Sequence, residues 1–237
     1  MTLAYDIQKA NELFYNGTGL VAESVIPPGI AGHDKSFVNP LRSGDMKTRL
    51  KKAKKLLAEA GYPGGKGLPV ITYDVTASTV ARQMGEFFKQ NMAEIGINIK
   101  VIQNPWPELQ KKVKTSTNMM FGMAWGADYP DAENFLQLLY GPNKAPGANG
   151  SNYDDPVFNT KFKKASIMQD SPERTKIYKE LSKMAAEQAP MIYGVHRRIF
   201  TLNNKWLKNF IFTDFEQGQE MYLDIDLDVK KEWIKKL

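Results

Sequence analysis

The sequence predicts an α/β fold, in which helices pack on a mixed or parallel sheet. Between residues 48 and 125, segments with apolar residues at helical spacing alternate with short apolar runs that are typical of strands. An alternation of this kind builds a sheet with helices on its faces. Hydrophobic residues make up 42% of the 237 residues and charged residues 24%, which suits a globular chain of one large domain or two small ones.

Capping and breaking residues set the ends of the expected helices. Gly61 stops one helix, Ser78 or Thr79 begins the next, and Pro105 lies in the first turn of a third. Ser171, followed by Pro172 and Glu173, is a capped start of a later helix. Four helices and three strands are expected before residue 126, in this order: a helix at 3–14, a helix at 48–60, a strand at 70–75, a helix at 78–95, a strand at 97–102, a helix at 105–113 and a strand at 119–125.

The second half of the chain is expected to be mainly helical at first and then extended. Its expected parts are a Gly/Pro/Asn-rich loop at 141–150, a helix pair at 156–168 and 172–188, short strands at 191–195 and 197–202, an aromatic segment at 209–225 and a basic helix at 230–237. The aromatic segment includes Phe210, Phe212, Phe215 and Tyr222.

The expected strand at 119–125 runs directly into an acidic and aromatic segment. Asp128 follows this apolar run between Trp125 and Tyr129, and Asp131 lies three residues further on. A carboxylate beside a buried strand is costly to hide without a positive or hydrogen-bonding partner. In one interpretation, Asp128 or Asp131 caps the next helix. In the other, Asp128 points into a cleft where it binds a cation, and the two rings form the walls.

The residues that enzymes use are scarce in this chain. There is no cysteine, and the two histidines, His33 and His196, stand at no metal-ligand spacing. No Gly-x-Ser-x-Gly nucleophile motif occurs, and the glycine-rich turn at 63–67 lacks the ending of a phosphate loop. We therefore expect no catalytic residue, no metal and no cofactor.

Charge and hydropathy exclude two further classes of protein. The net charge of +6 comes with no nucleic-acid-binding motif, and its densest run, Lys47 to Lys55, is interpreted as a solvated helix face. No stretch approaches the roughly 20 apolar residues that span a membrane. The first residues also lack the basic start and long apolar core of a signal peptide.

Five segments resemble one known family. The run Trp-Gly-Ala-Asp-Tyr-Pro-Asp-x-x-Asn-Phe-Leu, which begins at Trp125, resembles the signature of the extracytoplasmic solute-binding proteins of family 5, the oligopeptide- and dipeptide-binding proteins of peptide ABC transporters. Four more segments resemble the family in the same order and spacing: the helix at 53–62, the strand at 95–101 followed by Trp106, the stretch at 149–158 and the stretch at 188–193. Together they cover essentially the whole chain.

The resemblance implies both an architecture and partners. It implies a lobe of the type II periplasmic-binding-protein fold, with residues 1–204 as the second, C-terminal lobe of a two-lobed protein. Residues 205–237 would be a tail that returns to a missing first lobe. The expected partners are a peptide ligand, the membrane permease of an ABC transporter and that first lobe, in a periplasmic or other extracytoplasmic location. We also expect the isolated lobe to bind peptide weakly and to self-associate through its aromatic tail.

The resemblance also implies roles for particular residues. Asp128 would bind the terminal ammonium of a peptide, Trp125 and Tyr129 would be pocket walls, and Trp106 would be a further aromatic of the site. Some members carry a basic residue for the peptide carboxylate, and the nearest basic residues here are Lys111, Lys112 and Lys114. We take Lys114 as the candidate, although the sequence does not decide which lysine faces the cleft. A core role for Trp106 stays open as well.

Two alternatives remain at this stage. The family scaffold could bind a non-peptide solute such as a sugar, a nickel complex or haem. Less in keeping with the sequence, the chain could be a small hydrolase that uses Asp128 with His196.

Overall fold

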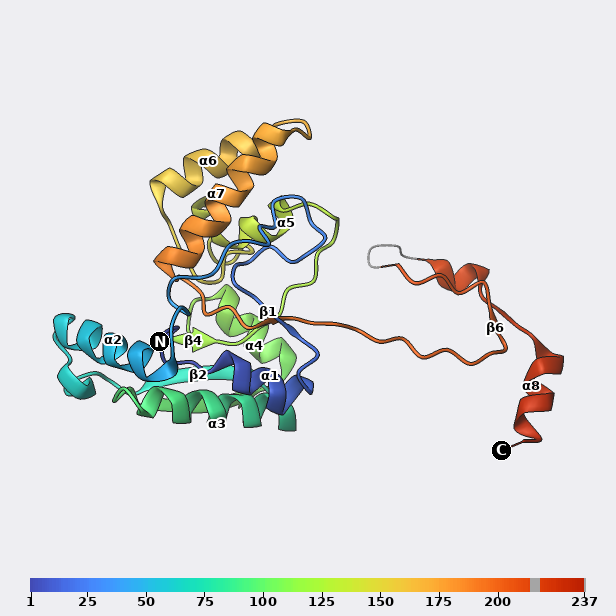
Figure 1. Ribbon diagram of the computed structural model, residues 1–237, viewed down its shortest axis with the longest axis horizontal. Coiled ribbons are helices and arrows are strands. Elements are labelled where there is room, and N and C mark those ends of the chain that lie inside the picture. Colours follow the sequence, from blue (N-terminus) through green and yellow to red (C-terminus); the bar gives the residue numbers. More distant parts are fainter. Residues whose placement is uncertain (214–217, 237) are drawn as a thin grey trace.

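The structure, a computed structural model, describes residues 1–213 and 218–236 (Figure 1). Its helices are α1 (Ile7–Tyr15), α2 (Met46–Glu59), α3 (Thr79–Ala93), α4 (Trp106–Lys114), α5 (Glu133–Leu136), α6 (Pro156–Ser166), α7 (Pro172–Gln188) and α8 (Leu227–Ile234). Its strands are β1 (Leu20–Val21), β2 (Ile71–Thr76), β3 (Ile99–Asn104), β4 (Met120–Phe121), β5 (Val195–His196), β6 (Leu207–Lys208) and β7 (Asp224–Ile225). The expected helices and strands up to residue 126 thus occur in the expected order, although the structure adds the short strand β1 between the first two helices.

A parallel three-stranded sheet, in the order β3-β2-β4, organises the first half of the chain. Ile71 pairs with Ile99 at one end of β2, and Thr76 pairs with Asn104 at the other. Helix α3 connects β2 to β3 and α4 connects β3 to β4, and Figure 1 shows them on opposite sides of β2. Because all three strands run the same way, their carboxyl ends meet at one edge of the sheet.

Side-chain caps explain where most of the long helices begin. Among the described residues, six side chains accept a hydrogen bond from a backbone amide in the first turn of their helix, and these are Asp6 (α1), Asp45 (α2), Ser78 (α3), Asp155 (α6), Ser171 (α7) and Asp226 (α8). The expected caps Ser78 and Ser171 are thus confirmed. Pro156 and Pro172 occupy the first helical positions of α6 and α7, where a missing amide hydrogen costs nothing.

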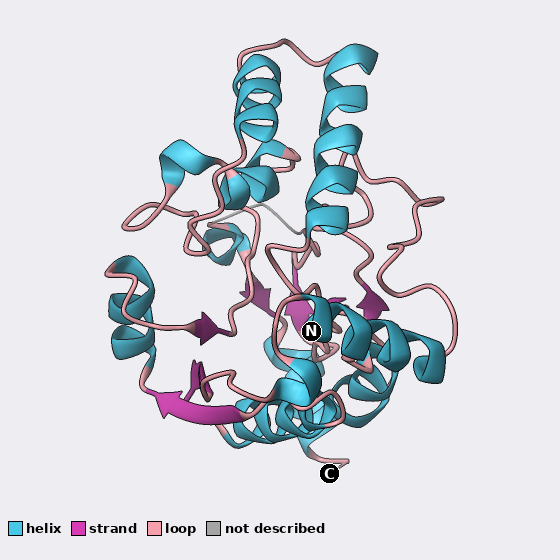
Figure 2. Cartoon of the chain, turned by 90° about the vertical axis from the view of Figure 1, so that its left-hand side faces the viewer, coloured by secondary structure: helices cyan, strands magenta, loops and turns pink. Residues whose placement is uncertain are grey.

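The buried side chains form two main clusters. One joins α1, α2, α3 and β3, with Phe88, Met92 and Ile99 among its members. The other joins α5, α6 and α7 to the loop around Ile26. Figure 1 and Figure 2, two views that differ by a turn of 90° about the vertical axis, both show the antiparallel pair α6 and α7 standing above the strands. A small cluster of Ala22, Ala186 and Tyr193 lies where the chain passes between the two main clusters, next to the antiparallel pair β1–β5.

Three expected strands differ from the structure. The one at 119–125 is reduced to β4, which pairs with β2 over two residues, and Met119, Met123 and Trp125 are 58%, 41% and 43% exposed. After the Gly122 amide bonds to the Asp74 carbonyl, the chain leaves the sheet, so this apolar run lines a surface. The one at 197–202 is absent, since no described segment pairs with it, and the strand at 191–195 is reduced to β5.

After β5 the chain leaves the body of the molecule as an extended tail (Figure 1). The antiparallel pair β6–β7 and helix α8 form its far end. Its apolar side chains are strongly exposed, including Phe200 (72%), Leu202 (96%) and Ile211 (71%). Phe215, expected in the aromatic segment, lies outside the described residues. None of the described helices is long and apolar enough to cross a membrane.

Candidate ligand-binding site

The acidic and aromatic segment lies at the carboxyl edge of the parallel sheet. Residues 125–131 follow β4, and Trp106 follows β3 as the first residue of α4. Because β3 and β4 flank β2 in a parallel sheet, both segments leave from the same edge. In open α/β sheets this edge is where ligands bind.

The loop that carries Asp128 is anchored at its far end in the helical cluster. Ala132, Phe135 and Leu136 are between 0% and 8% exposed and pack among α6 and α7. The loop thus starts at the sheet and ends in the second cluster, so it bridges the two hydrophobic cores.

Asp131 helps to hold the far end of the loop in place. One of its oxygens, Oδ1, accepts the Glu133 amide at 2.8 Å, and the other, Oδ2, lies 2.6 Å from Nη1 of Arg174. Arg174 also donates to the Ala165 carbonyl at 3.0 Å and lies over the ring of Tyr178. Asp131 thus bonds to the first amide of α5, although the cap position of that helix is Ala132 and not Asp131. The charge of Asp131 is neutralised by a side chain from α7.

Asp128 differs from Asp131 in having no such partner. Its side chain is exposed, caps no helix and forms no ion pair within the part of the chain that the structure describes. Its side chain makes one hydrogen bond with the described residues, and this bond is long, 3.5 Å from Oδ2 to the Nδ2 of Asn134. A carboxylate in this state is available to a cation from outside the chain.

Trp125 and Tyr129 stand on either side of Asp128 in the loop. Their side chains are 43% and 42% exposed. The Trp125 indole donates to the Oδ1 of Asn134 at 2.7 Å, and the Tyr129 hydroxyl donates to the Glu133 carboxylate. Burial and then the bond to Glu133 raise the pKa of Tyr129 to about 12, so its hydroxyl keeps its proton at neutral pH.

The structure brings these three residues together and leaves the other two candidates apart from them. Among the described residues, no hydrogen bond, ion pair or ring contact joins Trp106 or Lys114 to the loop, and Trp106 is 49% exposed rather than part of the core. Lys114 is exposed at the last turn of α4, about 12 Å along the helix from Trp106. Lys114 therefore lies toward the edge of the sheet that is opposite to the edge where Asp128 lies.

Lys112, another of the three lysines, has a structural partner. Its Nζ lies 2.8 Å from Oδ1 of Asp74, a residue of β2 that is 2% exposed. Asn104, the last residue of β3, donates to the same oxygen at 2.8 Å. Sequence reasoning missed this buried pair, although an aspartate inside the apolar run of β2 was a signal that it needed a cation.

Asn134 is the second residue that sequence reasoning missed as part of the site. It is completely buried, and its side chain contacts both Trp125 and Asp128. Its place in the resembling motif was visible, but motif position alone does not say what the side chain touches.

The two histidines lie close together but away from this loop. Their ring centroids are 6.4 Å apart, and Nδ1 of His33 donates to the Ile26 carbonyl at 2.8 Å. Burial, and then the neighbouring His33, lower the pKa of His196 to about 4. No contact joins His196 to Asp128, and the described residues contain no group of three or more potential metal ligands from His, Cys, Asp and Glu.

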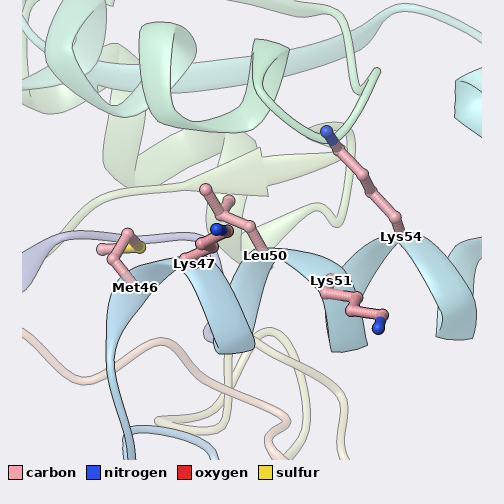
Figure 3. A pocket seen from close by; sticks show the side chains of 5 residues that line it. All are labelled: Met46, Lys47, Leu50, Lys51 and Lys54. Carbon is pink, nitrogen blue, oxygen red and sulfur yellow. The ribbon is translucent and has the colours of Figure 1, made fainter.

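A hollow of about 570 Å³ lies elsewhere, along α2 (Figure 3). It is lined by Met46, Lys47, Leu50, Lys51 and Lys54. Its lysines would repel an ammonium group, and they form no ion pairs among the described residues, as expected of a solvated face. A second hollow, of about 270 Å³, lies in the tail between residues 199–202 and 210–212.

The family model for bacterial extracellular solute-binding proteins, family 5 Middle, matches residues 1–147. The chain belongs to this family. The family-5 chain is 27% identical over 237 residues to heme-binding protein A of Haemophilus influenzae and 26% identical over 216 residues to the dipeptide-binding protein of Escherichia coli. These alignments cover 97% and 89% of this chain but 41% and 39% of the relatives. The chain therefore spans about two fifths of the length of the curated relatives it matches.

Solved structures agree on the fold of this family-5 chain. The periplasmic binding protein DppA of Helicobacter pylori, in complex with a peptide, has a TM-score of 0.70 and 27% identity, over 82% of this chain and 36% of that one. OppA of Burkholderia pseudomallei has a TM-score of 0.80 over 90% of this chain and 42% of that one, and at 19% identity it shows the fold alone. The expected α/β lobe of the type II periplasmic-binding-protein fold is confirmed.

Proposed function

We propose that this family-5 chain is the ligand-binding lobe of a protein that captures peptides for an ABC importer, and that Asp128 binds the peptide's terminal ammonium. One observation carries the proposal. Of two carboxylates three residues apart, Asp131 is neutralised by Arg174, whereas Asp128 is exposed at the carboxyl edge of the sheet and has no cationic partner among the described residues.

The residues around Asp128 suit a primary ammonium. Such a group is a compact cation that forms short, charge-assisted hydrogen bonds with a carboxylate. The exposed rings of Trp125 and Tyr129 add apolar area and cation–π attraction at little entropic cost. Trp106, which leaves from the same edge of the sheet, is a further wall in the proposal. Lys114 remains a prediction for the peptide carboxylate, and its distance along α4 argues for a different residue in that role.

In the proposed function, this chain forms one side of the ligand-binding cleft. Because the chain spans about two fifths of its relatives' length, the other contacts to an extended peptide would come from a first lobe. Residues 1–204 would form the second lobe, and the exposed apolar side chains of the tail from 205 onward would pack against the first lobe. Alone, the lobe would bind peptide weakly and self-associate through this tail.

The protein would do no covalent chemistry. Its family consists of extracellular solute-binding proteins, and delivery to a membrane permease would follow closure of two lobes around the ligand. The hydrolase alternative loses its geometric basis, since His196 lies beside His33 and not beside Asp128.

Mass spectrometry of small molecules that co-purify with the protein tests the proposal. The protein is taken at native length from its own cell envelope, as wild type, as Asp128→Ala and as the control Glu94→Gln, an exposed acid at the end of α3. A ladder of short peptides that is lost in Asp128→Ala and kept in Glu94→Gln would support both the substrate class and the role of Asp128. A single non-peptide solute such as haem would keep the fold and overturn the substrate class.

A further inference from the structure

Asn134 connects the candidate ligand residues to the interior of the protein. It is 0% exposed, whereas Asp128 is exposed and Trp125 is 43% exposed. Its Oδ1 accepts the Trp125 indole N–H at 2.7 Å, and its Nδ2 faces Oδ2 of Asp128 at 3.5 Å. A buried polar side chain needs hydrogen-bond partners, and both of the partners found here are ligand candidates.

The chemistry of the two partners fixes the orientation of the Asn134 amide. An indole N–H can only donate, and an ionised carboxylate can only accept. The reversed amide would set a donor against Trp125 and an acceptor against Asp128. An aspartate at this position would place a second carboxylate against Asp128, and a leucine of similar size would satisfy neither partner. Asparagine is therefore matched to both.

The backbone of Asn134 is held firmly enough to act as a platform. Its amide donates to the Asp131 carbonyl at 3.2 Å, and its own carbonyl accepts from Nε2 of Gln137 at 3.2 Å. The next two residues, Phe135 and Leu136, are buried in the helical cluster. Movement of Asn134 would disturb this packing, so its side chain presents a fixed acceptor and a fixed donor to the loop.

We infer that Asn134 is a positioning residue, which holds the ring of Trp125 and the carboxylate of Asp128 in the arrangement that receives a cationic group. The inference rests on the proposed function for the identity of that group. At 3.5 Å the contact with Asp128 is at the outer limit of a hydrogen bond. This contact therefore orients the carboxylate of Asp128 and leaves the negative charge available to a ligand.

The first readout needs no ligand. NMR spectra of the indole N–H groups, with the Trp125 signal assigned by its loss in Trp125→Phe, report whether that N–H is bonded. In Asn134→Leu the signal should shift and exchange faster with water. The control Gln137→Met removes a bond to the backbone of Asn134 and should leave the signal in place. An unmoved Trp125 signal in a folded Asn134→Leu protein would overturn the inference.

The second readout is selectivity in the protein of native length. Asn134→Leu should lower the affinity for trialanine with a free amino terminus about fivefold to tenfold, the worth of one hydrogen bond, and leave the affinity for N-acetyl-trialanine unchanged. Replacement of Trp125 by β-(benzothiophen-3-yl)alanine exchanges the indole N–H for sulfur and keeps the two-ring shape, so it gives the same test if Asn134→Leu fails to fold. Equal weakening of both peptides, or of neither, would overturn the inference.

The two readouts separate this inference from the proposed function. If the wild-type protein binds neither peptide, the proposed function fails. The indole signal then still decides whether Asn134 positions Trp125.

Discussion

The same substitution should destabilise the protein at Asp131 and leave its stability almost unchanged at Asp128. Asp131→Asn keeps the oxygen that accepts the Glu133 amide, but it removes the charge that faces Arg174 at 2.6 Å. The Arg174 side chain is 12% exposed, and its one remaining ionic partner among the described residues would be Asp170, whose side chain is 95% exposed. A hydrogen bond between charged groups is worth about 1.5–3 kcal/mol. We therefore expect Asp131→Asn to lower the free energy of unfolding by about 2 kcal/mol.

Asp128→Asn should leave stability within about 0.5 kcal/mol of wild type, since this side chain is exposed, caps nothing and has one long contact. Urea unfolding followed by circular dichroism measures both variants under one condition. Equal destabilisation by the two substitutions would refute the division of roles between a structural Asp131 and a ligand-binding Asp128. So would an Asp131→Asn protein as stable as wild type.

Three further predictions concern the rest of the chain. Lys112→Met leaves the buried Asp74 without its cation and should cost about 3 kcal/mol in urea unfolding, whereas the double variant with Asp74→Leu should recover most of that loss; an unaffected Lys112→Met protein would contradict the pairing. Burial, and then the neighbouring His33, lower the pKa of His196 to about 4, so the unfolded chain takes up a proton between pH 6.5 and 4 that the folded chain does not. Stability should fall as pH drops through this window, and the fall should be shallower in His196→Gln; identical pH profiles would argue against it. Sedimentation velocity should show concentration-dependent association of the chain that is lost when residues 205–237 are removed, and a monomer at all concentrations would count against an exposed apolar tail.

Local signals in the sequence predicted much of the fold. Helix starts depend on residues within one turn of each other, so the caps at Ser78 and Ser171 could be recognised without knowledge of the tertiary structure. The parallel sheet followed from the alternation of helices and strands. The strand at 119–125 was misjudged because an apolar run indicates low polarity and not burial, and its pairing partner β2 meets it over only two residues.

The site was predicted in part, because local sequence patterns indicate neighbouring residues but not distant contacts. Asp128, Trp125 and Tyr129 lie within five residues, so a single segment indicated all three. The choice between Asp128 and Asp131 depended on Arg174, a partner 43 residues away on another helix. No pattern near Asp131 could indicate that contact. The apolar run around Asp74 indicated the need for a cation, but not that Lys112, 38 residues away, supplies it.

The most direct test of the central claim is a calorimetric comparison of trialanine and N-acetyl-trialanine on the protein of native length, as wild type and as Asp128→Asn. Acetylation removes the ammonium and leaves the rest of the peptide. Since charge-assisted bonds are worth about 1.5–3 kcal/mol, acetylation should weaken binding to wild type by about tenfold or more and should have little further effect on Asp128→Asn. A wild-type protein that binds both peptides equally well would contradict the claim that Asp128 receives a peptide's amino terminus.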